Sequence, residues 1–85
     1  MIGQFVTSKA GHDKGTLYVV VAEAGDYVML SDGLLKPLAA PKKKRRKHIQ
    51  PIRQMISQET LDALQNGTAK DEQIRYAIRH YQPGI

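Results

Sequence analysis

The sequence predicts a mainly β fold: a small, strongly bent antiparallel sheet or barrel with a helical appendage at its C-terminus. Five of the seven glycines fall within the first 33 residues, where they separate short apolar segments. From Ser57 onward, the spacing of apolar residues changes from that of strands to that of helices. Eighty-five residues with 41% apolar content can bury one small core.

The first strand is expected at residues 2–8, where apolar side chains alternate only in part. A loop follows at residues 9–15, with Gly11 and Gly15 available for positive φ angles. Residues 16–22 are β-branched and aromatic and form the strongest strand pattern in the chain. The nearly continuous apolar character of this segment indicates that both of its faces are covered.

Two tight turns separate the strands that come next. A hairpin turn at residues 24–26 leads into a returning strand at 27–30, and Asp32-Gly33 marks the second turn. Residues 34–38 are expected to form a short fourth strand, which Pro37 confines to the sheet edge because proline has no N–H to donate. Short strands joined by tight turns are typical of a small antiparallel barrel.

The last third of the chain is expected to form two short helices. Ser57 is a good N-cap for the first, and Asn66-Gly67 supplies its C-terminal stop. The second helix is expected to begin near Thr68 or Asp71. Its apolar residues follow a helical stripe: Ile74, Ala77, Ile78 and Tyr81. This stripe is expected to pack onto the barrel, with a dimer or partner surface as the alternative.

The most strongly charged stretch is the basic run, residues 41–48, in which six consecutive side chains are positive. From Lys36 through Arg53 there are eight Lys or Arg and no Asp or Glu, so no carboxylate is expected nearby to neutralise the run. The other residues hold five basic and eight acidic side chains. The net charge of +5 is therefore local, and such a strip binds a polyanion or a membrane surface, or is simply hydrated.

The segment from Phe5 to Gly15, followed by the strand from Leu17 to Val21, resembles the KOW motif, in which two strands flank a loop rich in glycine and lysine. Together with Asp32-Gly33 and the basic run, it is similar to small bacterial KOW-domain RNA-binding proteins related to archaeal and eukaryotic large-subunit ribosomal proteins. The similarity covers roughly residues 2–50. It implies an SH3-like barrel that contacts RNA through its loops. We expect this barrel, with the basic run, at residues 1–50, and the helical pattern of the remaining chain predicts an extension at residues 51–85.

A nucleic acid is the favoured partner, because closely spaced phosphates let each bound lysine or arginine release a counterion. The resemblance to KOW-domain proteins implies RNA rather than DNA. With one Phe, four Tyr and no Trp, binding is expected to depend on phosphates and shape rather than on extensive base stacking. The glycines of the 9–15 loop would let its backbone approach the RNA. The expected RNA-binding residues are Lys9, Gly11, His12, Lys14, Gly15, Lys36, Lys42, Lys43, Lys44, Arg45, Arg46, Lys47 and His48.

Other functions receive less support from the sequence. The histidines lack metal-ligand spacing, no P-loop is present, and no Ser/His/Asp set can be assigned from sequence, so no catalytic residue, metal site or cofactor is expected. Cysteine is absent and no segment has the form of a signal peptide or membrane span, so a cytoplasmic location is expected.

The main alternative is a protein-interaction module of the transcription or translation machinery that uses the barrel and the C-terminal helices. Ribosomal proteins and translation factors are further candidate partners, and the oligomeric state stays open.

Overall fold

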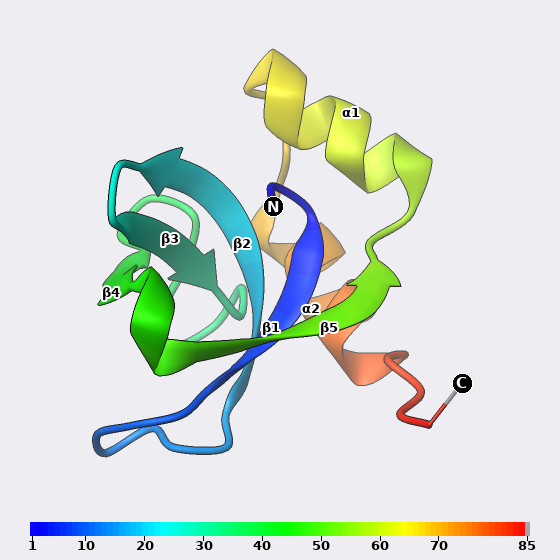
Figure 1. The fold of residues 1–85 in the computed structure, drawn as a ribbon. Coiled ribbons are helices and arrows are strands. Elements are labelled where there is room, and N and C mark those ends of the chain that lie inside the picture. The colour runs from blue at the N-terminus through cyan, green and yellow to red at the C-terminus, as the bar shows by residue number, and fades with distance from the viewer. Residues whose placement is uncertain (85) are drawn as a thin grey trace.

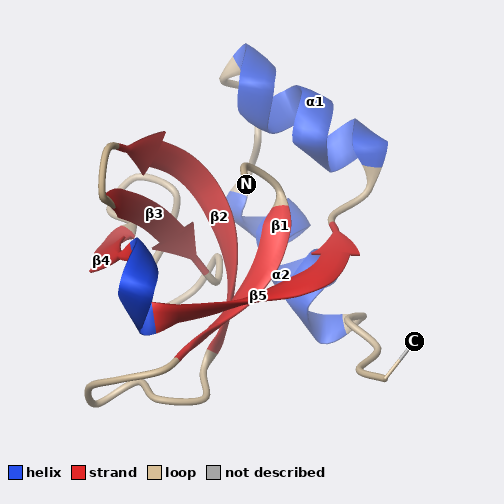
Figure 2. Cartoon of the chain, viewed as in Figure 1, coloured by secondary structure: helices blue, strands red, loops and turns tan. Residues whose placement is uncertain are grey.

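Five antiparallel strands form one bent sheet in the order β4-β3-β2-β1-β5, and two helices follow at the C-terminus (Figures 1 and 2). The structure is a computed structural model that describes residues 1–84. The predicted fold class, a small antiparallel barrel with a helical appendage, is confirmed. The elements are β1 (Gln4–Ser8), β2 (Leu17–Ala24), β3 (Tyr27–Ser31), β4 (Lys42–Arg45), a 3-10 helix (Arg46–His48), β5 (Ile49–Met55), α1 (Gln58–Asn66) and α2 (Asp71–Arg79).

Strand β2 lies at the centre of the sheet, and its first half is covered on both faces, as its apolar pattern predicted. Val19 and Val20 are both fully buried, but they belong to different apolar clusters. One cluster fills the interior of the barrel, and the other lies beneath the C-terminal helices. Register shifts in β2 after Val20 and in β1 after Gln4 interrupt the ladders, and such irregularities increase the bend of a sheet. The first three strands lie within two residues of their expected positions.

The fourth strand is not where the sequence analysis placed it. Residues 34–38 belong to a loop, and β4 instead forms from Lys42–Arg45, within the basic run. The reason is local hydrogen bonding: the carboxylate of Asp32 accepts from the N–H groups of Leu34 and Lys36, each at 2.9 Å. Those two donors are therefore unavailable to a strand ladder.

The barrel also extends further along the chain than expected. β5 runs through Met55 and pairs with β1, so the barrel passes the boundary expected at residue 50. Pro51 is tolerated there because β5 is an edge strand. The helical part begins at Ser57, whose side chain accepts the first cap hydrogen bond from Thr60 N–H.

Both helices lie where the sequence placed them. Gly67 ends α1 in the left-handed conformation, with φ of 73°, and α2 begins at Asp71, one of the two expected starts. The apolar stripe of α2 packs onto the sheet, as expected: Ile74 is fully buried, and the Tyr81 ring lies 5.0 Å from that of Phe5. Neither helix is long and apolar enough to span a membrane, nor is any other helix within residues 1–84.

The loop between β3 and β4 is fastened to α2. Arg75 donates to the carbonyl of Gly33 at 2.7 Å, and Asp71 accepts from Leu38 N–H at 2.7 Å. Gly33 has φ of 75°, and a Cβ at this position would collide with the carbonyl oxygen of Asp71. Only glycine therefore lets the loop lie this close to the helix. Two leucines at its tip, Leu34 and Leu35, are 68% and 80% exposed.

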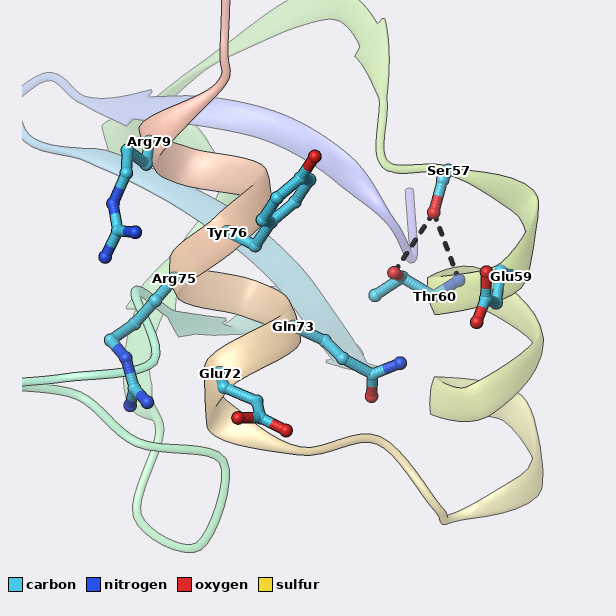
Figure 3. A pocket seen from close by; sticks show the side chains of 8 residues that line it. All are labelled: Ser57, Glu59, Thr60, Glu72, Gln73, Arg75, Tyr76 and Arg79. Atoms are coloured by element: carbon cyan, nitrogen blue, oxygen red, sulfur yellow. Dashed lines mark hydrogen bonds between the residues drawn. The ribbon is translucent and has the colours of Figure 1, made fainter.

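A hollow of about 560 Å³ separates α1 from α2 (Figure 3). Its walls carry both signs of charge, from Glu59 and Glu72 on one hand and Arg75 and Arg79 on the other. The side chain of Ser57, which lines this hollow, accepts a hydrogen bond from Thr60 N–H as the N-cap of α1.

Candidate nucleic-acid interface

The basic run lies at the edge of the sheet, where strand β4 sorts its side chains onto two faces. Lys42 and Lys44 project toward the barrel interior, opposite buried residues of β3, because directly paired residues share a face. Lys43 and Arg45 project from the opposite face and are exposed. The strand period of two thus divides one continuous run of charge into an inner and an outer set.

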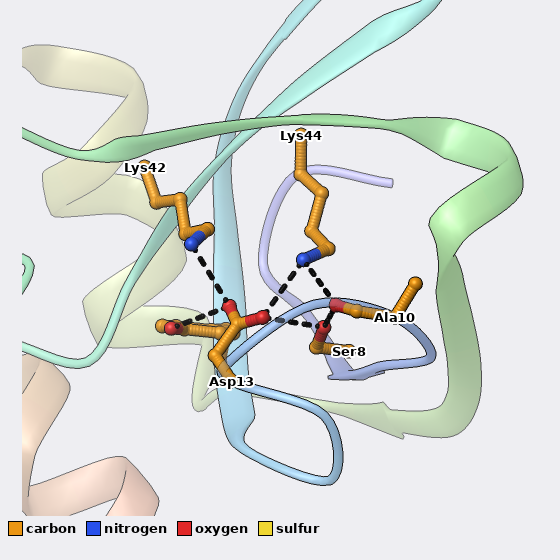
Figure 4. A network of polar contacts seen from close by, with 6 residues as sticks. Ser8, Ala10, Asp13, Lys42 and Lys44 are labelled. Atoms are coloured by element: carbon orange, nitrogen blue, oxygen red, sulfur yellow. Dashed lines mark hydrogen bonds and ion pairs between the residues drawn. The ribbon is translucent and has the colours of Figure 1, made fainter.

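The inner set converges on Asp13, a carboxylate from the 9–15 loop (Figure 4). Lys44 Nζ lies 2.8 Å from Asp13 Oδ1 and also donates to the carbonyl of Ala10 at 2.9 Å. Lys42 Nζ lies 3.2 Å from Asp13 Oδ2. The hydroxyls of Ser8 and Tyr18 approach the same carboxylate at 2.9 and 3.0 Å. The Asp13 side chain is only 14% exposed, and that of Lys44 only 9%.

These contacts shift two pKa values in opposite directions. Burial alone would raise the pKa of Asp13, but the hydrogen bonds from Lys44, Ser8, Tyr18 and Lys42 outweigh it and hold that pKa well below its usual range. Burial and the hydrogen bond to Asp13 raise the pKa of Tyr18 to about 12. Asp13 is therefore ionised and Tyr18 neutral at physiological pH.

Carboxylates do neutralise part of the basic run, contrary to the sequence expectation. Besides Asp13, Glu23 lies 2.9 Å from Arg46 and 3.6 Å from the N-terminal ammonium. The hydrogen bond from Arg46 lowers the pKa of Glu23. Both acids are distant from the run in sequence and reach it only through strand pairing and loop closure. Three expected RNA-binding residues, Lys42, Lys44 and Arg46, are thus engaged within the fold.

The outer set surrounds an aromatic ring. Lys43 Nζ lies 4.3 Å from the centroid of the Tyr27 ring, and the Arg45 guanidinium carbon lies 5.4 Å from it. These distances are in the range of cation–π contacts. Lys47 is exposed beyond the strand, and a depression of about 360 Å³ is lined by Arg45, Lys47, Arg46 and Asp26. Cationic groups dominate this depression, as an anion site requires.

The 9–15 loop adds exposed groups close to the end of the basic run. Lys9 N–H donates to the carbonyl of His48 at 2.8 Å, which fixes the base of the loop beside the 3-10 helix. Gly11 and Gly15 both have φ of 88°, as a tightly folded loop requires. The remaining expected contacts of this loop are also exposed, namely His12 and Lys14.

Lys36 lies in a different setting from the other predicted residues. Its backbone is held by Ser31 and Asp32 within the loop fastened to α2. Within residues 1–84, no hydrogen bond or ion pair joins Lys36 to the 9–15 loop or to β4. The structure therefore brings the loop and the basic run together but does not add Lys36 to them through any direct contact.

Sequence reasoning missed Tyr27 and the structural role of Asp13. Tyr27 could have been found by pairing the 27–30 strand with the basic run, but the strand wrongly expected at 34–38 occupied that place. Asp13 could be seen only as one acid in a glycine-rich loop. No local sequence pattern predicts that two lysines some thirty residues away contact its carboxylate.

Among residues 1–84, no group of three or more His, Asp or Glu side chains is placed to hold a metal ion. Comparison with known proteins found no family model and no curated protein sequence that matches the chain.

Proposed function

We propose that this protein binds structured RNA through the exposed cations of β4, the 3-10 helix and the 9–15 loop. The supporting observation is that Lys43, Arg45 and Lys47 remain exposed after the inner lysines have been neutralised. A surface on which cations outnumber acids attracts a polyanion. The resemblance to KOW-domain proteins favours ribosomal RNA, and with it a cytoplasmic, ribosome-associated protein that binds rather than catalyses.

The phosphate backbone would supply most of the affinity. Lys9 and Lys14 bring the exposed lysines and arginines of this interface to about five. If each of them neutralises one phosphate, affinity falls on the order of a hundredfold between 50 and 200 mM salt. Arg45 can also form two parallel hydrogen bonds to one phosphate, which a lysine cannot.

Binding to a ribosomal RNA fragment at several salt concentrations tests this proposal. The variant carries Lys43→Glu, Arg45→Glu and Lys47→Glu, which reverses the exposed charges and spares the Asp13 contacts. We expect the native protein to bind with a steep salt dependence, and the variant to lose both affinity and most of that slope.

A matched control carries Arg53→Glu, Lys70→Glu and Arg79→Glu, three exposed cations outside the interface. Both variants replace three positive charges by three negative ones, so each formal net charge falls from +5 to −1. If affinity depends only on net charge, the two variants weaken binding equally. That result, or a flat salt response of the native protein, would contradict the proposed interface.

A protein-interaction module is the second candidate, and one observation favours it. Leu34 and Leu35 are exposed at the tip of a loop that Asp32, Asp71 and Arg75 hold in one conformation. The apolar stripe of α2, proposed for this role from the sequence, is instead packed against the sheet. Replacing both leucines by serine should then abolish partner binding without affecting RNA binding, in a pull-down from ribosomal extract.

A further inference from the structure

The outer face of strands β2, β3 and β4 has a regular arrangement of side chains around Tyr27. Directly paired residues of antiparallel strands project to the same face. The strand registers therefore place two rows of three side chains across this face. The rows are Ala24, Tyr27 and Arg45, and next to it Ala22, Met29 and Lys43.

The two flanks of the Tyr27 ring differ in size and charge. On the β2 side, each row ends in an alanine, so this strand places only methyl groups beside the ring. On the β4 side, Lys43 Nζ and the Arg45 guanidinium carbon lie over the ring itself, 4.3 and 5.4 Å from its centroid. The half-buried ring thus has cations over it on one side and little bulk on the other, so a base would stack on the side toward β2.

A ligand suited to this face must be both flat and anionic. An aromatic side chain stacks on a base, and flanking cations bind the phosphates on either side of it. A nucleotide combines these two properties. Away from the ends of a duplex, both faces of each base are already stacked on their neighbours, so along a continuous duplex the ring finds no base to receive.

We infer that Tyr27 is a stacking platform for one unpaired nucleotide of the bound RNA, with Lys43 and Arg45 on its phosphates. This inference rests on the proposed function and adds a specificity to it. The interface distinguishes an RNA loop, bulge or single strand from a continuous duplex. The depression lined by Arg45 and Lys47 adjoins one of these two cations and would receive a neighbouring phosphate of the strand.

The other tyrosines do not offer such a platform. Tyr18 is buried and donates to Asp13, and Tyr81 packs on Phe5. Tyr76 is 62% exposed, but its ring lies 4.1 Å from that of His80, centroid to centroid. It also lines the hollow in which Glu59 and Glu72 balance Arg75 and Arg79, so positive charge does not prevail there (Figure 3).

Fluorescence anisotropy with labelled RNA tests the inference, using an eight-nucleotide single strand, a duplex of the same length, and AMP as a competitor. The variants are Tyr27→Leu, Tyr27→Phe and, as a control at a more exposed tyrosine, Tyr76→Leu. Stacking on an aromatic residue contributes about 1–3 kcal/mol per base, so Tyr27→Leu should weaken single-strand binding roughly 5- to 150-fold. Its duplex affinity and salt slope should not change, since the cations remain. Tyr27→Phe and Tyr76→Leu should bind both RNAs as the native protein does.

Failure of this inference can be told apart from failure of the proposed function. If Tyr27→Leu binds the single strand as tightly as the native protein does, the platform is wrong while RNA binding stands. Equal losses on single strand and duplex would also overturn it, because they indicate a general defect of the surface. If AMP competes as well as the oligonucleotide, the site takes free nucleotides and not RNA. If the native protein binds neither RNA, the proposed function and the inference both fail.

Discussion

Two halves of the same basic run, the inner set and the outer set of β4, have opposite surroundings. Lys42 and Lys44 turn inward and share one carboxylate, whereas Lys43 and Arg45 turn outward beside an aromatic ring. The side chains are chemically alike and adjacent in sequence. Only the alternation of a strand separates them, so a count of positive charge overstates the number of cations available to a ligand.

The inner half also shows why a strand can form from lysines and arginines. The apolar stems of the inward lysines can lie against the barrel interior, while their ammonium groups reach Asp13. The same contacts tie the 9–15 loop to β4. We therefore regard the inner half as a structural clamp and the outer half as the ligand surface.

Replacing Asp13 by alanine should remove the carboxylate that the inner lysines share, and it should have the largest effect on stability. The change leaves the ammonium of Lys44, which is 9% exposed, without its anionic partner. Removing one member of a buried ion pair is strongly destabilising, and partial solvent contact reduces the expected cost here to about 2–3 kcal/mol. For a domain of this size, the melting temperature should fall by roughly 10–20 °C.

Asp26→Ala is the control for that prediction, because Asp26 is exposed in the turn between β2 and β3. Its effect on the free energy of unfolding should stay within about 0.5 kcal/mol. Urea unfolding of both variants provides the comparison. Similar losses of stability would show that Asp13 is not a clamp.

Neighbouring lysines provide the sharpest test of the difference between the two halves. Lys44→Ala should destabilise the fold by about 1–2 kcal/mol, because it removes charged hydrogen bonds to Asp13 and to the carbonyl of Ala10. Lys43→Ala should change stability by less than about 0.5 kcal/mol but weaken RNA binding. Unfolding and RNA titration on the same two proteins should give opposite rankings. If the rankings agree, the inner and outer halves have no separate roles.

Acid should remove the contribution of Asp13 to stability. In the unfolded chain this carboxyl binds a proton near pH 4, whereas the folded chain binds it only at lower pH. Between these values the unfolded state holds more protons, so acidification favours unfolding. The stability difference between the native protein and Asp13→Asn should therefore be full above about pH 4 and shrink as the pH falls further. Urea titrations from pH 6 to 2 measure it, and parallel curves would contradict the assignment.

The sequence determined the local elements with good accuracy. Glycines, β-branched runs, the Ser57 cap and the Gly67 stop each act within a few residues, so the first three strands and both helices could be located. The helical stripe also predicted that α2 packs on the sheet. These features follow from backbone preference and hydrophobic periodicity, which are encoded locally.

The partners of each charge were decided only by the tertiary structure. Asp32 accepts hydrogen bonds from the backbone N–H groups of Leu34 and Lys36, so residues 34–38 form a loop instead of the fourth strand. The fourth strand forms within the basic run, and the barrel continues into β5. Strand pairing then brought Tyr27 beside the outer cations, and loop closure brought Asp13 beneath the inner lysines. A sequence can show that six cations are consecutive. Which of them are neutralised depends on contacts between residues far apart in the chain, and these exist only after folding.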